Sequence, residues 1–256
     1  MYSNPKARIA TADELIASMD RWGIDVSVVM NFGWSSQDMC TETNSYIIEA
    51  VHKYPGRLVG FCAIQPREGA AALKELERCA LAGLRGIGEM RPDDQGFELD
   101  DVKVMGPVVE AAQSYKMVFL THSSEPVGHL YPGKGTLTPD KLYSFITAFP
   151  ALTVVLAHWG GGLPFYSLMP EVARALKNTY LDCAATSLLY KPDVFQTVGA
   201  LMGYDKILFA SDYPLVAQGR AVTEIRDLVI QEEAKQAILG GNARRLLHLD
   251  TGRLAT

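Results

Sequence analysis

Short apolar runs rich in β-branched residues alternate with amphipathic segments along nearly the whole chain. This alternation predicts repeated β-α units, in which helices cover a sheet of parallel strands. Strands in such a sheet are buried on both faces and are therefore almost entirely apolar. Seven runs fit this description, at residues 24–30, 57–64, 84–89, 117–121, 153–157, 179–183 and 206–210.

The segments between these runs show helical periodicity. Thr11 can cap the first helix, Glu14 completes a capping box, and the Trp22-Gly23 pair ends the helix. Further helices are expected near residues 43–53, 69–81, 102–115, 139–148, 163–176, 192–202, 221–229 and 232–247. With 256 residues, 48% of them hydrophobic, we interpret residues 1–256 as a single α/β domain of the TIM (β/α)8-barrel type.

A barrel of this type has eight strands, and the sequence shows seven. Strand one is missing, because only about ten residues precede the first helix and Pro5, Lys6 and Arg8 disfavour a central strand. We therefore expect either an N-terminally shortened gene product or a barrel that closes in an unusual way.

Bulk properties exclude several classes of protein. The net charge of −5 is modest and the 24 Lys and Arg residues are scattered, which argues against a nucleic-acid partner. No apolar stretch approaches the length of a membrane span. Cys40, Cys62, Cys79 and Cys183 form no Cys-x-x-Cys pair and are expected to be reduced thiols. We predict a cytoplasmic protein with a small-molecule substrate, and a homo-oligomer remains open.

Four potential metal ligands stand at or just after the ends of predicted strands: Glu89, His122, His158 and Asp212. The first two gaps between them match one β-α-β unit of roughly 30 residues or more, and the third spans two units. The carboxyl ends of parallel barrel strands share one rim, so these side chains are expected to meet there. For Glu89 the alternative is a plain ion pair with Arg91 or Arg85.

Imidazole and carboxylate ligands suit a divalent ion, with zinc the first choice and manganese the alternative. A bound ion lowers the pKa of its water towards about 7, and an adjacent carboxylate can take the proton. Asp212 is the candidate for base and ligand, and His158 for a catalytic group that polarises the scissile bond.

Four sequence motifs resemble those of a known family: Thr-His-Ser-Ser-Glu, Ala-His-Trp-Gly-Gly-Gly, Ala-Ser-Asp-Tyr-Pro and Gly-Gly-Asn-Ala-Arg-Arg-Leu-Leu. From about residue 10 to residue 249 the chain resembles the amidohydrolase-related (amidohydrolase 2) family of metal-dependent barrel enzymes, which includes aminocarboxymuconate-semialdehyde decarboxylase-like members. The resemblance implies that His122, His158 and Asp212 belong to the metal site.

The chain departs from that family at its start. Members open with a His-x-His pair on strand one, whereas no histidine precedes His52 here. Lost ligands weaken metal binding, so the resemblance implies either a metal-free chain or a fragment whose start lies about 25 to 35 residues upstream.

The segment 123–135 after His122 is long and is expected to lie over the active rim. His129, Tyr131 and Lys134 are candidates for binding an anionic or phenolic substrate, with a surface turn as the alternative. Trp159 and Arg91 are further candidates for substrate contact, although an aromatic residue at such a position is as often a packing residue.

Three functions compete. The leading hypothesis is a metal-dependent hydrolase of a small carboxylated, amide, ester or lactone substrate. The second is a metal-dependent non-oxidative decarboxylase. The third is a catalytically inactive barrel kept for binding or assembly, because the His-x-His pair is missing.

Overall fold

The computed structural model describes residues 9–249. Within them one parallel sheet contains seven strands in sequence order, β1-β2-β3-β4-β5-β6-β7. The strands are β1 (Ser27–Val29), β2 (Leu58–Cys62), β3 (Gly86–Met90), β4 (Val118–Thr121), β5 (Val154–Leu156), β6 (Thr179–Asp182) and β7 (Ile207–Leu208). All seven predicted strands are confirmed, each shorter than its apolar run. Pro5, Lys6 and Arg8 lie outside the described residues.

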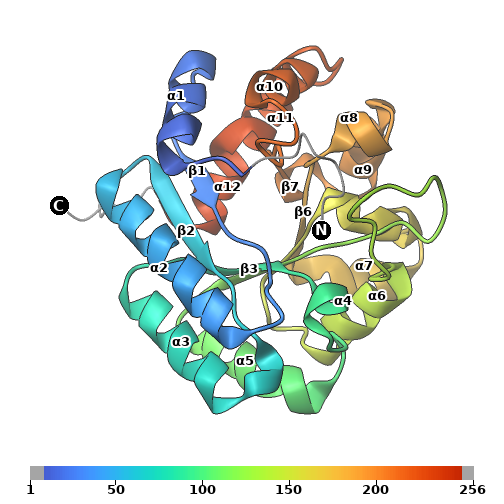
Figure 1. Ribbon diagram of the computed structural model, residues 1–256. Coiled ribbons are helices and arrows are strands. Elements are labelled where there is room, and N and C mark those ends of the chain that lie inside the picture. Colours follow the sequence, from blue (N-terminus) through green and yellow to red (C-terminus); the bar gives the residue numbers. More distant parts are fainter. Residues whose placement is uncertain (1–8, 250–256) are drawn as a thin grey trace.

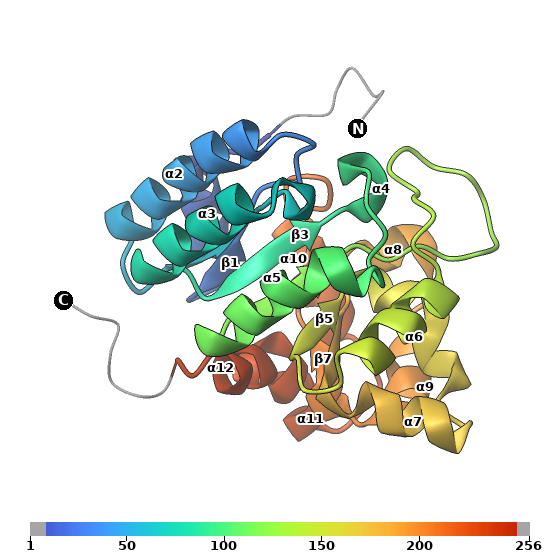
Figure 2. The ribbon, with the colours of Figure 1, turned by 90° about the horizontal axis from the view of Figure 1, so that it is seen from below.

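Helices surround the curled sheet, as Figure 1 shows in a view along the strands' central axis. The α-helices are α1 (Ala12–Trp22), α2 (Gln37–Lys53), α3 (Ala70–Leu81), α4 (Pro92–Gln95), α5 (Val102–Ser114), α6 (Pro139–Ala148), α7 (Pro170–Ala175), α8 (Thr186–Leu189), α9 (Asp193–Met202), α10 (Gln218–Arg226), α11 (Glu232–Gln236) and α12 (Asn242–Leu246). A π-helical segment, η5 (Ala237–Gly241), joins the last two. The turned view shows α2, α3 and α5 side by side over one flank of the sheet (Figure 2). The fold is the α/β barrel type that the sequence predicts, with a gap between β7 and β1.

Helices α1 and α10 close the outer ring across this gap. A Cβ atom at Gly219 in α10 would overlap the ring of Trp22 at the end of α1. The predicted capping box starts α1: Thr11 accepts a hydrogen bond from the Glu14 backbone, and the Glu14 side chain accepts one from the Thr11 backbone. The helical ring is therefore continuous, whereas within residues 9–249 β1 and β7 are the two edges of the sheet.

The apolar core has two layers. The larger layer lies between the sheet and the helices and includes Ile87, Phe119 and Phe145. The smaller layer lies inside the barrel and contains alternate residues of the strands, such as Val59 and Phe61 of β2. This alternation is what a strand buried on both faces requires. Among the described residues no helix combines the length and the apolar character needed to cross a membrane.

The predicted helix at residues 163–176 is wrong as a single element. Residues His158–Tyr166 form a 3-10 segment (η2), and only Pro170–Ala175 are α-helical (α7), with a further 3-10 turn at Leu176–Asn178 (η3). Five successive residues, 158 to 162, have positive φ angles between 52° and 93°. This left-handed run turns the chain at the rim before a right-handed helix can begin.

Candidate functional site

Three potential ligands meet at the carboxyl ends of neighbouring strands. Glu89 lies within β3, His122 follows β4 directly, and His158 follows β5 after one residue. One ligand atom from each of the three side chains lies within 4.8 Å of the other two. The structure therefore places these three residues at one rim, as the spacing of the strands predicts.

Glu89 forms the centre of this cluster. His122 Nδ1 lies 2.7 Å from Glu89 Oε1, and His158 Nε2 lies 3.8 Å from the same oxygen. The two imidazole rings are in edge contact, with centroids 5.0 Å apart. Because a carboxylate only accepts hydrogen bonds, His122 Nδ1 carries the proton in this arrangement.

Burial and charge set the protonation of the cluster in opposite directions. Burial opposes ionisation of Glu89, but the hydrogen bonds to His122 and His158 outweigh it and lower the pKa of this carboxyl. Burial also disfavours the His158 imidazolium, yet Glu89, Asp182 and Asp212 raise its pKa to about 10. Burial lowers the pKa of His122. These shifts favour the carboxylate form of Glu89, the charged form of His158 and the neutral form of His122.

Two further side chains hold His122. Ser124 Oγ lies 3.2 Å from His122 Nε2 and accepts a hydrogen bond from Gly135 N. Arg91 Nη1 lies 3.2 Å from His122 Nδ1, while Arg91 Nε donates to Asp94 and Nη2 to the carbonyl oxygen of Gly133. Because His122 Nδ1 donates to Glu89, it does not also accept from Arg91, and Arg91 is a buried cation at the site with two of its five N–H groups engaged, by Asp94 and Gly133.

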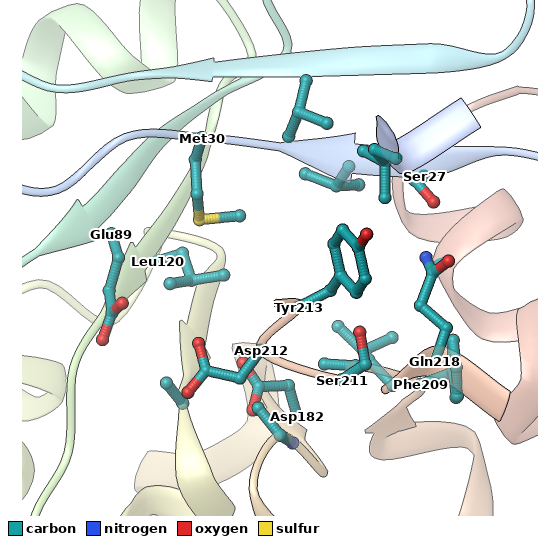
Figure 3. Close-up of a pocket in the computed structure, with 18 of the residues that line it drawn as sticks. Ser27, Met30, Glu89, Leu120, Asp182, Phe209, Ser211, Asp212, Tyr213 and Gln218 are labelled. Atoms are coloured by element: carbon teal, nitrogen blue, oxygen red, sulfur yellow. The ribbon is translucent and has the colours of Figure 1, made fainter. Parts of the chain in front are cut away.

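Asp212 faces the same cavity but is not part of the three-residue group. Burial raises the pKa of its carboxyl, against the opposing effect of the His158 charge. Asp212, Asp182 and Glu89 all line this cavity, and Figure 3 labels them. The role of Asp212 as a metal ligand stays a prediction.

Asp182 is a buried carboxylate that the sequence reading missed. It is the last residue of β6, and its Oδ1 accepts hydrogen bonds from His158 N at 2.9 Å and Ala184 N at 3.0 Å. Burial raises its pKa to about 6. Its position at a strand end is the same signal that singled out Glu89, so the Tyr-Leu-Asp-Cys string could have revealed it.

The long segment 123–135 is held in place largely by its own contacts. Tyr131 Oη donates to Glu125 Oε2 at 3.1 Å, and the ring of Tyr131 lies 5.5 Å from that of His129. Lys134 Nζ donates to the carbonyl oxygens of Val127 and His129. His129 and Tyr131 line the cavity, whereas Lys134 does not. The structure therefore places two of these three predicted substrate contacts at the site.

Trp159 is not at the site. Its side chain is fully buried, packs against Phe195 with ring centroids 4.8 Å apart, and donates from Nε1 to Thr186 Oγ1. The positive φ of Trp159 (60°) sends the side chain into the core instead of the cavity. Trp159, a candidate for substrate contact from the sequence, is therefore a packing residue.

The cavity extends from the rim down into the gap between β1 and β7 and has a volume of about 1960 Å³. Its rim end contains Glu89, His122, His158 and Asp212, and its inner wall is mostly apolar, with side chains such as Leu120. Tyr213 projects across it toward β1 (Figure 3). Apolar walls with a few polar groups at one end are the usual form of a small-molecule site.

Comparisons with known proteins fit this geometry. The sequence profile of the amidohydrolase family (Amidohydro_2) matches residues 2–249. The 2-amino-3-carboxymuconate-6-semialdehyde decarboxylase of Dictyostelium discoideum is 25% identical over 282 aligned residues, which cover 94% of this chain and 77% of the relative. The gamma-resorcylate decarboxylase of Polaromonas sp. (strain JS666) is 24% identical, with 93% of this chain and 87% of the relative covered.

Solved structures agree on the fold. A dihydroxybenzoic acid decarboxylase from Polaromonas sp. JS666, with bound manganese and the inhibitor 2-nitroresorcinol, superposes with a TM-score of 0.77 at 21% identity, covering 96% of this chain and 89% of that chain. At this identity the likeness shows a shared barrel. Since the family profile spans nearly the whole sequence, the chain belongs to the amidohydrolase family.

Proposed function

We propose that this chain is a metal-dependent, non-oxidative decarboxylase of a small aromatic or muconate-like carboxylic acid. The relatives named above support decarboxylation over the hydrolysis that was the leading expectation from the sequence, because each is named as a decarboxylase. The observation that carries the proposal is the convergence of Glu89, His122 and His158 at the rim.

The three side chains fit a divalent cation. They offer one carboxylate oxygen and two imidazole nitrogens, a borderline donor set that suits zinc or manganese. Three protein ligands leave coordination positions for a substrate. When bound, such an ion acts as a Lewis acid that stabilises negative charge on a substrate oxygen.

Arg91 is suited to binding the substrate's carboxylate. It lines the cavity, and its guanidinium has three N–H groups beyond the two bonded to Asp94 and Gly133. A charge-assisted bond from a buried guanidinium orients an anion strongly. Tyr131, two residues before Gly133, also lines the cavity and is the candidate contact for an aromatic ring.

Asp212 is suited to proton delivery. Its pKa is raised by burial, so its carboxyl holds a proton at higher pH than an exposed aspartate. In the proposed step Asp212 protonates the carbon that bears the substrate's carboxylate. The carbon–carbon bond then breaks, its electron pair returns to the unsaturated system, and CO2 leaves. Solvent reprotonates Asp212.

The test is CO2 release by the purified chain with and without added Mn2+ or Zn2+. Carboxyl-labelled 2,6-dihydroxybenzoate and 2-amino-3-carboxymuconate semialdehyde are the probes. We expect metal-dependent release, and a loss of about a hundredfold in kcat for Asp212→Asn. The exposed Asp227→Asn is the matched control and should keep wild-type activity.

Two results would overturn the proposal. Hydrolysis of a lactone or amide without CO2 release from either acid would favour the hydrolase. Failure to bind a stoichiometric divalent ion would favour the inactive barrel.

A further inference from the structure

The turn that carries His158 is held in an unusual backbone conformation. His158 and Trp159 have φ angles of 52° and 60°, and Gly160, Gly161 and Gly162 continue the left-handed run. Residues with a Cβ atom rarely adopt this conformation, so two consecutive examples need support from their surroundings. The direction of the His158 ring depends on that support.

The support comes from the end of β6 and the loop that follows it. His158 N donates to Asp182 Oδ1 at 2.9 Å, and His158 Nδ1 lies 3.3 Å from the carbonyl oxygen of Ala184. Trp159 Nε1 donates to Thr186 Oγ1 at 2.9 Å. Three successive contacts therefore tie the turn after β5 to the loop after β6.

Asp182 is the residue on which both segments converge. Its Oδ1 accepts the backbone N–H of His158 and also that of Ala184, the residue whose carbonyl oxygen faces the His158 ring. The side chain is buried at the cavity wall. One carboxylate oxygen thus contacts both the backbone of His158 and the residue that faces its ring.

The contact with Ala184 also selects the nitrogen that faces the site. A carbonyl oxygen only accepts, so His158 Nδ1 is the donor and Nε2 is the atom that points toward Glu89, 3.8 Å away. A histidine that binds a metal usually donates its other ring N–H to such an oxygen.

We propose that Asp182 is a positioning residue for the site, which holds the left-handed turn and thereby aims His158 Nε2 at Glu89 and His122. Its effect on catalysis rests on the proposed function. Its effect on the orientation of His158 does not, and can be measured on the metal-free protein.

The experiment compares Asp182→Ala with Asp182→Asn. The alanine removes the acceptor of the His158 N–H, whereas asparagine keeps an oxygen in the same place. Asp101→Ala is the matched control, because Asp101 Oδ1 also accepts two backbone N–H groups, from Lys103 and Val104, but at the start of α5.

Three readouts are used: 15N NMR of the His158 ring in the metal-free protein, Mn2+ affinity, and kcat and KM with the active acid. For Asp182→Ala we expect altered His158 nitrogen shifts and Mn2+ binding weaker by about ten- to a hundredfold. We expect a fall in kcat larger than any rise in KM. Asp182→Asn should stay within about threefold of wild type in Mn2+ affinity, and Asp101→Ala should leave the His158 signals unchanged.

Unchanged His158 signals and Mn2+ affinity in Asp182→Ala would overturn the proposal, as would an equal loss of affinity in Asp101→Ala. If Asp182→Ala does not fold, Asp182→Ser, whose hydroxyl is one atom shorter than the carboxylate, takes its place with the same expected result. If no acid is decarboxylated by the wild type, the NMR and Mn2+ measurements still decide the role of Asp182.

Discussion

The carboxylate of Glu89 and the imidazole of His122 lie 2.7 Å apart on neighbouring strands, β3 and β4. Each is the other's nearest polar partner across the rim, and His158 joins them from β5. Removing one member should therefore affect the whole group.

Glu89→Gln should abolish tight metal binding. The amide keeps the shape but loses the negative charge that partners both histidines, so we expect Mn2+ affinity to fall by at least about a hundredfold. Isothermal titration of the metal-free protein measures this. The exposed Glu98→Gln, which alters only an ion pair with Lys141, should bind Mn2+ as the wild type does. Equal affinities of the two variants would contradict the ligand assignment.

Gly161→Ala should destabilise the fold strongly. Its φ is +57°, and an added methyl group would overlap the backbone carbonyl of Ser124, next to His122. The left-handed backbone costs about 1–2 kcal/mol and the overlap about 1–3 kcal/mol more, so we expect a loss of about 3 kcal/mol in urea unfolding. Gly162→Ala also has a positive φ, but its nearest neighbour is the Phe165 ring at 3.5 Å. That control should lose only about 1–2 kcal/mol.

Glu75 should make stability sensitive to acid. It lies in α3 and is buried against α2. Asn44 Nδ2 of α2 donates to its Oε1, and Arg78 donates to both carboxylate oxygens. Burial opposes ionisation of Glu75, but these bonds outweigh burial and lower its pKa. A lowered folded-state pKa contributes stability above the unfolded value of about 4.3, and this contribution is lost as the pH falls through the folded value.

Glu75→Gln should therefore cost about 2 kcal/mol at pH 7, and the difference from wild type should shrink as the pH drops below about 4. Urea unfolding at a series of pH values gives both numbers. A difference that stays constant with pH would show that the charge of Glu75 contributes nothing.

The four cysteines should resist thiol reagents in the folded protein. Cys40, Cys62, Cys79 and Cys183 are all buried, and burial raises the pKa of Cys40 to about 11 and that of Cys183 to about 12. Few thiolates exist at pH 8 under these conditions, and the thiolate is the reactive form. Titration with Ellman's reagent should find no thiol in native protein and four in denaturant. Rapid labelling without denaturant would contradict this burial.

Strand order, element type and the shared rim could be predicted from the sequence because they follow from apolar periodicity and the polarity of parallel strands. The backbone conformation of the turns at the rim could not be predicted. Trp159 was expected at the pocket, but the φ angles of His158 and Trp159 decide where that ring goes, and apolar pattern carries no information on them. The strand-end position of Asp182 could be read from the sequence, but its contacts with the backbone of His158 and Ala184 could not, because no motif marks an acceptor of backbone N–H groups.

The gap between β1 and β7 determines where local unfolding of the barrel begins. Within residues 9–249 each of these strands is hydrogen-bonded to one neighbour, whereas β4 has a partner on both sides. The backbone N–H of Phe209, just after β7, donates a hydrogen bond to the carbonyl oxygen of Ile238 in η5 instead of to another strand. Backbone amides of β1 should therefore exchange with deuterium before those of β3 to β5. Local unfolding of the barrel should begin beside α1 and reach β4 last.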